Sequence, residues 1–184
     1  MAEGGWVDEV LDFWFGELSQ EDWYSGKAEV DEAIRSRFAE LPSRLARELS
    51  PEAVTDPRTA LAAIVALDQF PRNMHRGSGA AFASDAAAIG IARKALEAGF
   101  DAGMTPQERQ FLYMPFMHSE VLADQERCVD LFRSLGNEEG LKYAIEHRDI
   151  IAEYGRFPHR NKALGRSSSE AEQAFLGRHK GFGQ

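Results

Sequence analysis

Apolar residues recur every three or four positions along most of the chain, which is the spacing of residues on one face of an α-helix. The clearest apolar stripe has steps of four, three, four and four residues and consists of Ile34, Phe38, Leu41, Leu45 and Leu49. No segment alternates between apolar and polar residues for long enough to predict a strand. The pattern therefore predicts an all-α protein.

Capping signals place the starts of several helices. Asp56-Pro57 provides an N-cap followed by a proline at the first helical position. Thr105-Pro106-Gln107-Glu108 and Ser169-Glu170-Ala171-Glu172 both match the capping box, in which a hydroxyl and a carboxylate satisfy backbone amides reciprocally. We expect helices to begin at all three places.

Prolines and glycines predict where helices end. Because the residue before a proline is pushed out of the helical region, Phe70-Pro71 should end one helix and Pro115 should interrupt another. Pro42 should kink or divide its helix. Left-handed stops are expected at Gly99, Gly136 and Gly155. The result is seven or eight helices joined by short turns, and hence a single all-helical domain over residues 1–184.

Four polar residues lie on otherwise apolar helix faces and should point into the core. They are Asp68, His118, Gln125 and His147. A buried polar group without a partner costs roughly 1–3 kcal/mol, and more if it is charged. We therefore expect all four to be buried and at least two of them to share a network with an arginine of residues 156–166.

Charge is unevenly distributed along the chain. The formal net charge is −9, which argues against general affinity for nucleic acid or for an anionic membrane. Residues 148–166 nevertheless carry five basic and two acidic side chains. Phe70-Pro71-Arg72-Asn73 and Phe157-Pro158-His159-Arg160-Asn161 repeat one short pattern, which suggests two similar helix ends. The residues predicted to bind a small anion are Arg72, Asn73, Arg156, His159, Arg160, Asn161 and Arg166.

Other kinds of site find less support. No Glu-x-x-His or His-Glu-x-x-His spacing occurs, so no metal site is predicted; one would have to combine His118, His147 and His159 with a carboxylate such as Asp124. Cys128 lies in an apolar stripe, where cysteine is usually inert packing. No glycine-rich phosphate loop is present, and no cofactor is expected. Aromatic residues near the N-terminus could stack on a base or cofactor, but their helical spacing is that of core residues; they are Phe13, Trp14, Phe15, Trp23 and Tyr24.

Composition also bears on where the chain resides. The longest apolar run covers residues 60–67 and is less than half of a membrane span. The first residues do not read as an export signal, and a single cysteine cannot form an internal disulfide. These features predict a cytoplasmic protein.

Four segments, in this order, resemble one known family. They are Val10-Leu11-Asp12-Phe13-Trp14-Phe15-Gly16, Leu67-Asp68-Gln69-Phe70-Pro71-Arg72-Asn73, Phe111-Leu112-Tyr113-Met114-Pro115-Phe116-Met117-His118-Ser119-Glu120 and Gly155-Arg156-Phe157-Pro158-His159-Arg160-Asn161. The chain is identified by them as similar to the largely bacterial domain-of-unknown-function 924 family. The resemblance implies an α–α superhelix like the tetratricopeptide folds, although the 34-residue repeat of those folds is absent from the sequence. It implies no activity.

Three functions remain open at this point. The first is a binding module with a pocket for a small anionic ligand or an acidic peptide end. The second is a hydrolase that uses His118 or His147 as general base, with Asp68 or Glu120 orienting the imidazole and arginines holding an anionic substrate. The third is a protein–protein scaffold with a purely structural polar network. A histidine bonded to a carboxylate beside open space would favour the enzyme, whereas exposed apolar surface on the concave side would favour the scaffold.

Overall fold

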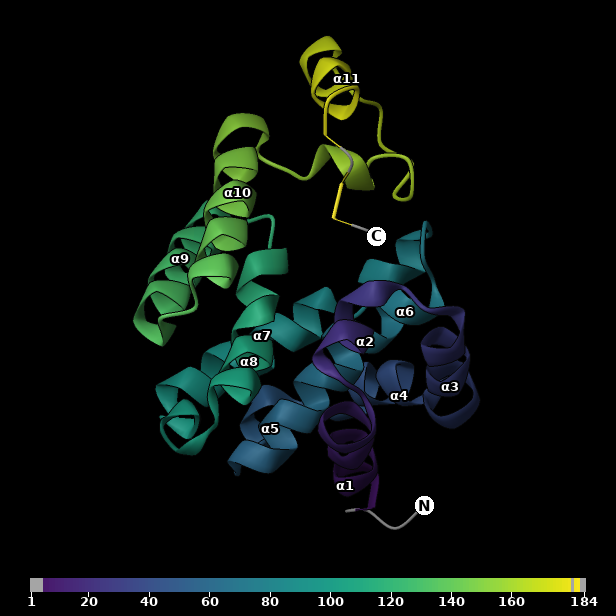
Figure 1. Cartoon of the computed structure of the whole chain (residues 1–184), viewed down its shortest axis with the longest axis vertical. Coiled ribbons are helices and arrows are strands. Elements are labelled where there is room, and N and C mark those ends of the chain that lie inside the picture. Colours follow the sequence, from purple (N-terminus) through teal and green to yellow (C-terminus); the bar gives the residue numbers. More distant parts are fainter. Residues whose placement is uncertain (1–4, 180, 183–184) are drawn as a thin grey trace.

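A computed structural model describes residues 5–179 and 181–182, in which the secondary structure is entirely helical (Figure 1). The all-α prediction is confirmed, with more helices than the seven or eight expected. The α-helices are α1 (Gly5–Leu11), α2 (Gln20–Ser25), α3 (Ala28–Phe38), α4 (Leu41–Glu48), α5 (Pro57–Ile64), α6 (Phe70–Met74), α7 (Asp85–Glu97), α8 (Pro106–His118), α9 (Leu122–Leu135), α10 (Glu138–Tyr154) and α11 (Glu170–Leu176).

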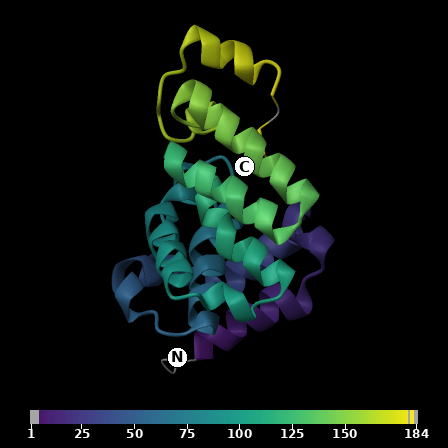
Figure 2. The same cartoon turned by 90° about the vertical axis from the view of Figure 1, so that its left-hand side faces the viewer.

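The helices form two groups on either side of the molecule. Helix α9 packs between α8 and α10, and α5 packs against α1, α7 and α8. Helix α6 packs against α3 and lies on the same side as α2. Viewed from the side of α9 and α10, α11 lies at the end of the molecule opposite α1 (Figure 2). The space between α2 and α6 on one side and α8 and α10 on the other contains the site described below.

The predicted helix starts are confirmed by their hydrogen bonds. The Asp56 carboxylate accepts from the backbone amide of Thr59 at 2.9 Å, and both capping boxes form, at Thr105 and at Ser169. The predicted stops at Gly136 and Gly155 adopt φ of 72° and 69°, a left-handed conformation that glycine reaches without a steric penalty. Capping chemistry is local, so the sequence contains all of it.

Two prolines behave differently from the prediction. Phe70-Pro71 does not end a helix, because a π-helical segment, Val65–Gln69, leads directly into α6 and places Pro71 in the first turn, where a backbone amide is not required. Pro115 does not interrupt α8, which continues to His118; the chain leaves the helix at Ser119 instead. The expected division at Pro42 is confirmed, since α3 and α4 are separate helices.

Aromatic side chains from distant helices form the centre of the core. The Phe38 ring stacks on that of Phe70 with centroids 4.8 Å apart, and Trp14 meets Phe111 edge to face at 5.4 Å. These four side chains are at most 3% exposed. A smaller cluster around Phe157 holds α11 against the end of α10. In the described part of the chain, no helix combines the length and the apolar character needed to cross a membrane.

Candidate functional site

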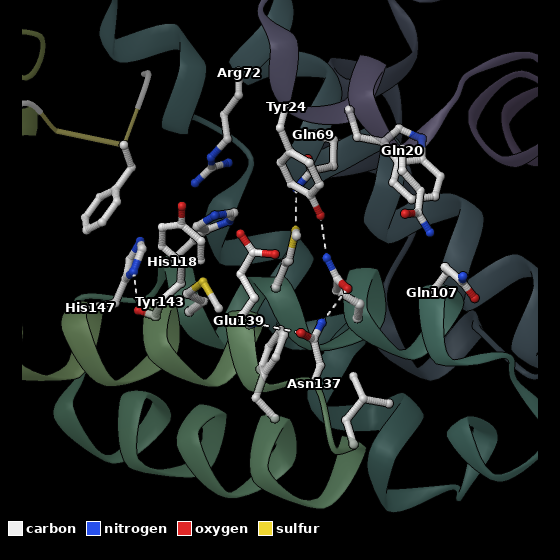
Figure 3. A pocket seen from close by; sticks show the side chains of 18 of the residues that line it. Gln20, Tyr24, Gln69, Arg72, Gln107, His118, Asn137, Glu139, Tyr143 and His147 are labelled. Carbon is white, nitrogen blue, oxygen red and sulfur yellow. Dashed lines mark hydrogen bonds between the residues drawn. The ribbon is translucent and has the colours of Figure 1, made fainter.

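A cavity of about 950 Å³ lies between the two groups of helices (Figure 3). Each wall is one face of a helix, and its residues recur at helical spacing. Residues 72 and 73 come from α6 and residues 69 and 76 flank it, while residues 107, 110, 114 and 118 come from α8 and residues 139, 143 and 147 from α10. One end of the cavity contains Arg72, His118 and His147, and the other contains the amides of Gln20, Gln107 and Asn137.

Asp68 and His118 form a buried pair at the first of these ends. The imidazole Nδ1 of His118 lies 2.8 and 2.9 Å from the two carboxylate oxygens of Asp68. The amide of Gln69 also donates to this carboxylate, at 2.6 Å. Because an ionised carboxylate only accepts hydrogen bonds, Nδ1 carries the proton and Nε2 keeps its lone pair. Nε2 has no hydrogen-bond partner within the described residues, and the His118 side chain lines the cavity.

The surroundings favour this protonation state. Burial raises the pKa of Asp68, but the positive charge of Arg72 and hydrogen bonds from His118 and Gln69 outweigh it, so the carboxyl pKa lies below its usual range. Burial and the positive charge of Arg72 lower the pKa of His118, against the opposing attraction of Asp68. His118 is therefore a neutral base near pH 7, held by an ionised carboxylate.

His147 presents a second unprotonated nitrogen on the neighbouring wall. Its Nδ1 donates to the backbone oxygen of Tyr143 at 2.7 Å, which leaves the lone pair on Nε2. Its ring centroid is 6.5 Å from that of His118, and it stacks on Phe182 at 3.7 Å. Burial and the proximity of His118 lower the pKa of His147 to about 3.

A buried network of charges supports Asp68. The Arg72 guanidinium donates to the backbone oxygen of Asp68 at 2.6 Å and binds the carboxylate of Asp85 at 2.8 and 3.0 Å. Arg160 donates to the same carboxylate at 3.2 Å. The predicted burial of Asp68, His118, Gln125 and His147 is confirmed, and two of them, Asp68 and His118, share this network with Arg160. Gln125 instead donates to backbone carbonyls at the end of α8.

The arginine loop has internal partners for its charges. Arg156 pairs with Glu172 at 2.7 Å, and Arg166 pairs with Glu120 at 2.8 Å. Glu120 also accepts from the amide of Phe157, so it orients the loop, and it forms no hydrogen bond with His118 or His147. Of the seven residues predicted to bind an anion, the cavity lining contains Arg72 and Asn73; Arg156, His159, Arg160, Asn161 and Arg166 lie outside it.

Asp124 and Cys128, which the sequence analysis also considered, do not line the cavity. Asp124 pairs with Arg93 at 2.7 Å and accepts a hydrogen bond from the Ser119 hydroxyl at 2.6 Å. Among residues 5–179 and 181–182, no cluster of three or more His, Cys, Asp or Glu side chains could hold a metal ion. Cys128 is fully buried, and burial raises the pKa of its thiol.

Several lining residues were not singled out by the sequence. Tyr24 is 60% exposed and faces the cavity rather than the core, contrary to the expectation for the N-terminal aromatic residues. Glu139 and Tyr143 precede His147 by eight and four residues, so all three share one face of α10. That spacing was visible in the sequence, but nothing in it showed that this face of α10 borders a cavity.

Acidification is expected to destabilise the fold because the buried histidines resist protonation. In the folded chain the pKa is lowered to about 3 for His147 and about 4 for partly buried His159, in both cases chiefly by burial, whereas the unfolded value is 6.5. The stabilisation is therefore complete above pH 6.5 and is lost as the pH falls toward the native values. From pH 7 to pH 5 the loss is at most about 2 kcal/mol for His147 and less for His159. Urea unfolding at pH 7, 6 and 5 measures this loss of stability, and His147→Gln should make the loss smaller. A free energy of unfolding that does not change over this pH range would contradict the prediction.

Comparison with known proteins identifies a family and a similar solved structure. A model of the family described as "Bacterial protein of unknown function (DUF924)" matches residues 10–180. The chain is similar to the solved structure of the protein of unknown function ATU0120 from Agrobacterium tumefaciens, with 34% identity and a TM-score of 0.86. The match covers 94% of this chain and 97% of that one. No curated protein matches the chain. The chain therefore belongs to the DUF924 family of bacterial proteins of unknown function.

Proposed function

We propose that this protein is an enzyme that uses His118 as a general base on a small polar substrate bound in the cavity, most simply a hydrolase. The observation that carries the proposal is the Asp68–His118 pair. A buried carboxylate fixes the Nδ1–H tautomer, and the free Nε2 belongs to a side chain that lines open space. A general base needs this tautomer and a pKa at or below the working pH.

The lining residues favour water as the nucleophile. Ser25 is the one serine among the described lining residues, and its hydroxyl donates to the backbone oxygen of Asp22 on the opposite wall from His118. In the proposed step, Nε2 of His118 takes a proton from water while the water oxygen bonds to the substrate's carbonyl carbon. The bond to the leaving group then breaks, and the imidazolium returns the proton to that group. Arg72 would stabilise the negative charge that develops on the carbonyl oxygen.

Binding without catalysis is the second candidate. Arg72 and Arg76 are on the same wall of the cavity, one turn apart, and Arg72 points toward His118 (Figure 3). An arginine pair of this kind suits a carboxylate or phosphate group. In this reading Asp68 and His118 would only shape the pocket.

We also propose that the helices form a tetratricopeptide-like superhelix. A cytoplasmic location is part of the same proposal and is supported by the single cysteine.

A hydrolysis panel with the purified protein separates the two candidates. The panel contains 4-nitrophenyl esters, amino-acid anilides, lactones and phosphomonoesters, and each compound is also tested for binding by chemical-shift titration. Hydrolysis of one class with an acid limb below pH 6.5, the ordinary histidine value, is expected. Saturable binding without hydrolysis of any bound compound would overturn the enzyme in favour of the binding module.

The tautomer can be tested without a substrate. Long-range ¹H–¹⁵N NMR of the imidazole rings distinguishes Nδ1–H from Nε2–H. We expect His118 to be neutral and protonated at Nδ1 at pH 7. A protonated imidazolium or an Nε2–H tautomer would remove the base from the cavity and contradict the proposal.

A further inference from the structure

One carboxylate faces the cavity, and it has no internal partner. Glu139 is the one acidic residue among the described lining residues, and it forms no hydrogen bond or ion pair within the described part of the chain. It lies in the first turn of α10, and its carboxylate points into the space between Tyr24 and His118 (Figure 3). By contrast, the carboxylates that contact lining residues Arg72, Arg76 and His118 are bound by them; they belong to Asp85, Asp31 and Asp68.

Two exposed tyrosines flank this carboxylate. Tyr24 is 60% exposed and Tyr143 is 48% exposed, and both line the cavity. Tyr143 is one helical turn after Glu139, whereas Tyr24 comes from α2 on the facing wall. The pKa of Tyr24 is raised to about 12, chiefly because its hydroxyl is enclosed and also because the charge of Glu139 is nearby. A hydrogen bond from Gln110 opposes this shift. The Tyr24 ring is therefore neutral, and the faces of both tyrosine rings attract cations.

The arginines of the cavity do not cancel the negative charge of Glu139. Arg72 is bound by the carboxylate of Asp85, and Arg76 is bound by that of Asp31 with two contacts of 2.9 Å. Each positive charge on the wall is thus paired with a carboxylate; Asp85 is shared with Arg160, and Asp68 supplies the second negative charge of that cluster. The charge left without compensation is that of Glu139, so the middle of the cavity favours a positive group.

We propose that Glu139, Tyr24 and Tyr143 form a subsite for an ammonium or guanidinium group of the substrate. The inference rests on the proposed function in one respect: the cation would anchor the substrate while its reactive carbonyl lies near His118. A carboxylate and two aromatic faces are the groups that recognise an organic cation. The amides at the far end of the cavity would bind uncharged polar atoms of the same molecule.

A structural role for Glu139 is the alternative reading. An acidic residue in the first turn of a helix stabilises the helix dipole whether or not a ligand is present. Glu138 occupies the same turn and is exposed, as Glu139 is, but it does not line the cavity. Glu138→Gln is therefore a matched control, because it removes the same charge from the same helix end.

The test compares two probes of nearly equal size. Nα-acetyl-lysine amide carries an ammonium group, and Nα-acetyl-norleucine amide has the same four-carbon side chain with a hydrogen in its place. Binding is followed by ¹H–¹⁵N chemical-shift titration at fixed ionic strength, because salt screens exposed charges. The lysine probe should bind about tenfold more tightly than the norleucine probe, as expected for one ion pair with aromatic contacts.

Two variants test whether Glu139 causes the preference for the lysine probe. Glu139→Gln should abolish the preference for the lysine probe, and Glu138→Gln should keep it. Equal affinity for the two probes, no saturable binding of the lysine probe, or a preference that survives in Glu139→Gln would each overturn the subsite. The same titration in His118→Asn separates the two proposals: a retained preference supports the subsite whether or not the wild-type protein hydrolyses any compound of the panel.

Discussion

Replacing His118 with asparagine is expected to leave the protein folded and to lower kcat/KM by roughly 10²–10⁴-fold, the usual contribution of a general base. The asparagine amide can donate to Asp68 from near the position of Nδ1, so the buried carboxylate keeps a partner. No basic nitrogen then remains at the position of Nε2. The measurement is the rate of hydrolysis of the compound that the panel identifies, with thermal unfolding as the check on folding.

A second histidine that is paired with a carboxylate provides the control. His179 lies 2.9 Å from Glu146 and borders no part of the cavity that contains His118. His179→Asn should therefore leave kcat/KM unchanged. Asp68→Asn should lower the rate as well, and the double variant should be little worse than His118→Asn alone, because the two residues act as one unit. Equal rates for wild type and His118→Asn would show that the imidazole is not the base.

The sequence was informative about the fold wherever the signal was local. The helix starts at Asp56 and Thr105 depend on residues within four positions of each other, and both were predicted correctly. The consequences of Pro71 and Pro115 were not. Whether a proline ends a helix depends on tertiary packing around the helix, and here both residues are fully packed within the core. Burial overrides the local preference at Pro115, whereas the place of Pro71 in the first turn of α6 removes the conflict.

The buried residues of the candidate site could be predicted from the sequence, whereas its exposed residues could not. Asp68 and His118 were identified because a polar residue on an apolar face must find a partner. The sequence did not say that they would be each other's partner, since 50 residues separate them. Nor could it show that Glu120 faces Arg166 rather than a histidine, because both pairings have the same chemistry. Glu139 and Tyr24 read as ordinary surface residues until the opposing walls of the cavity are known.

Asp68→Asn is expected to reduce the free energy of unfolding by about 3–5 kcal/mol, the usual cost of breaking a buried ion pair. Arg72, Arg160, Asp68 and Asp85 form a cluster with balanced charges, and Asp68 is 1% exposed. Without its carboxylate, two guanidinium groups share Asp85 alone. The new amide also meets the donating amide of Gln69, so a hydrogen bond is lost on that side. Urea unfolding at pH 7 measures the change.

The origin of this loss in unbalanced charge can be tested with two further variants. Asp130→Asn removes a carboxylate whose side chain is 63% exposed and pairs with Arg133, and it should cost no more than about 1 kcal/mol. Arg160→Met combined with Asp68→Asn should recover part of the loss, because methionine can keep the packing on Phe82 and Phe157 while the cluster becomes neutral again. If Asp68→Asn costs no more than Asp130→Asn, the charges of the cluster are not coupled. If the double variant is less stable than Asp68→Asn by the full cost of Arg160→Met alone, the loss comes from hydrogen bonds to Asp68 and not from its charge.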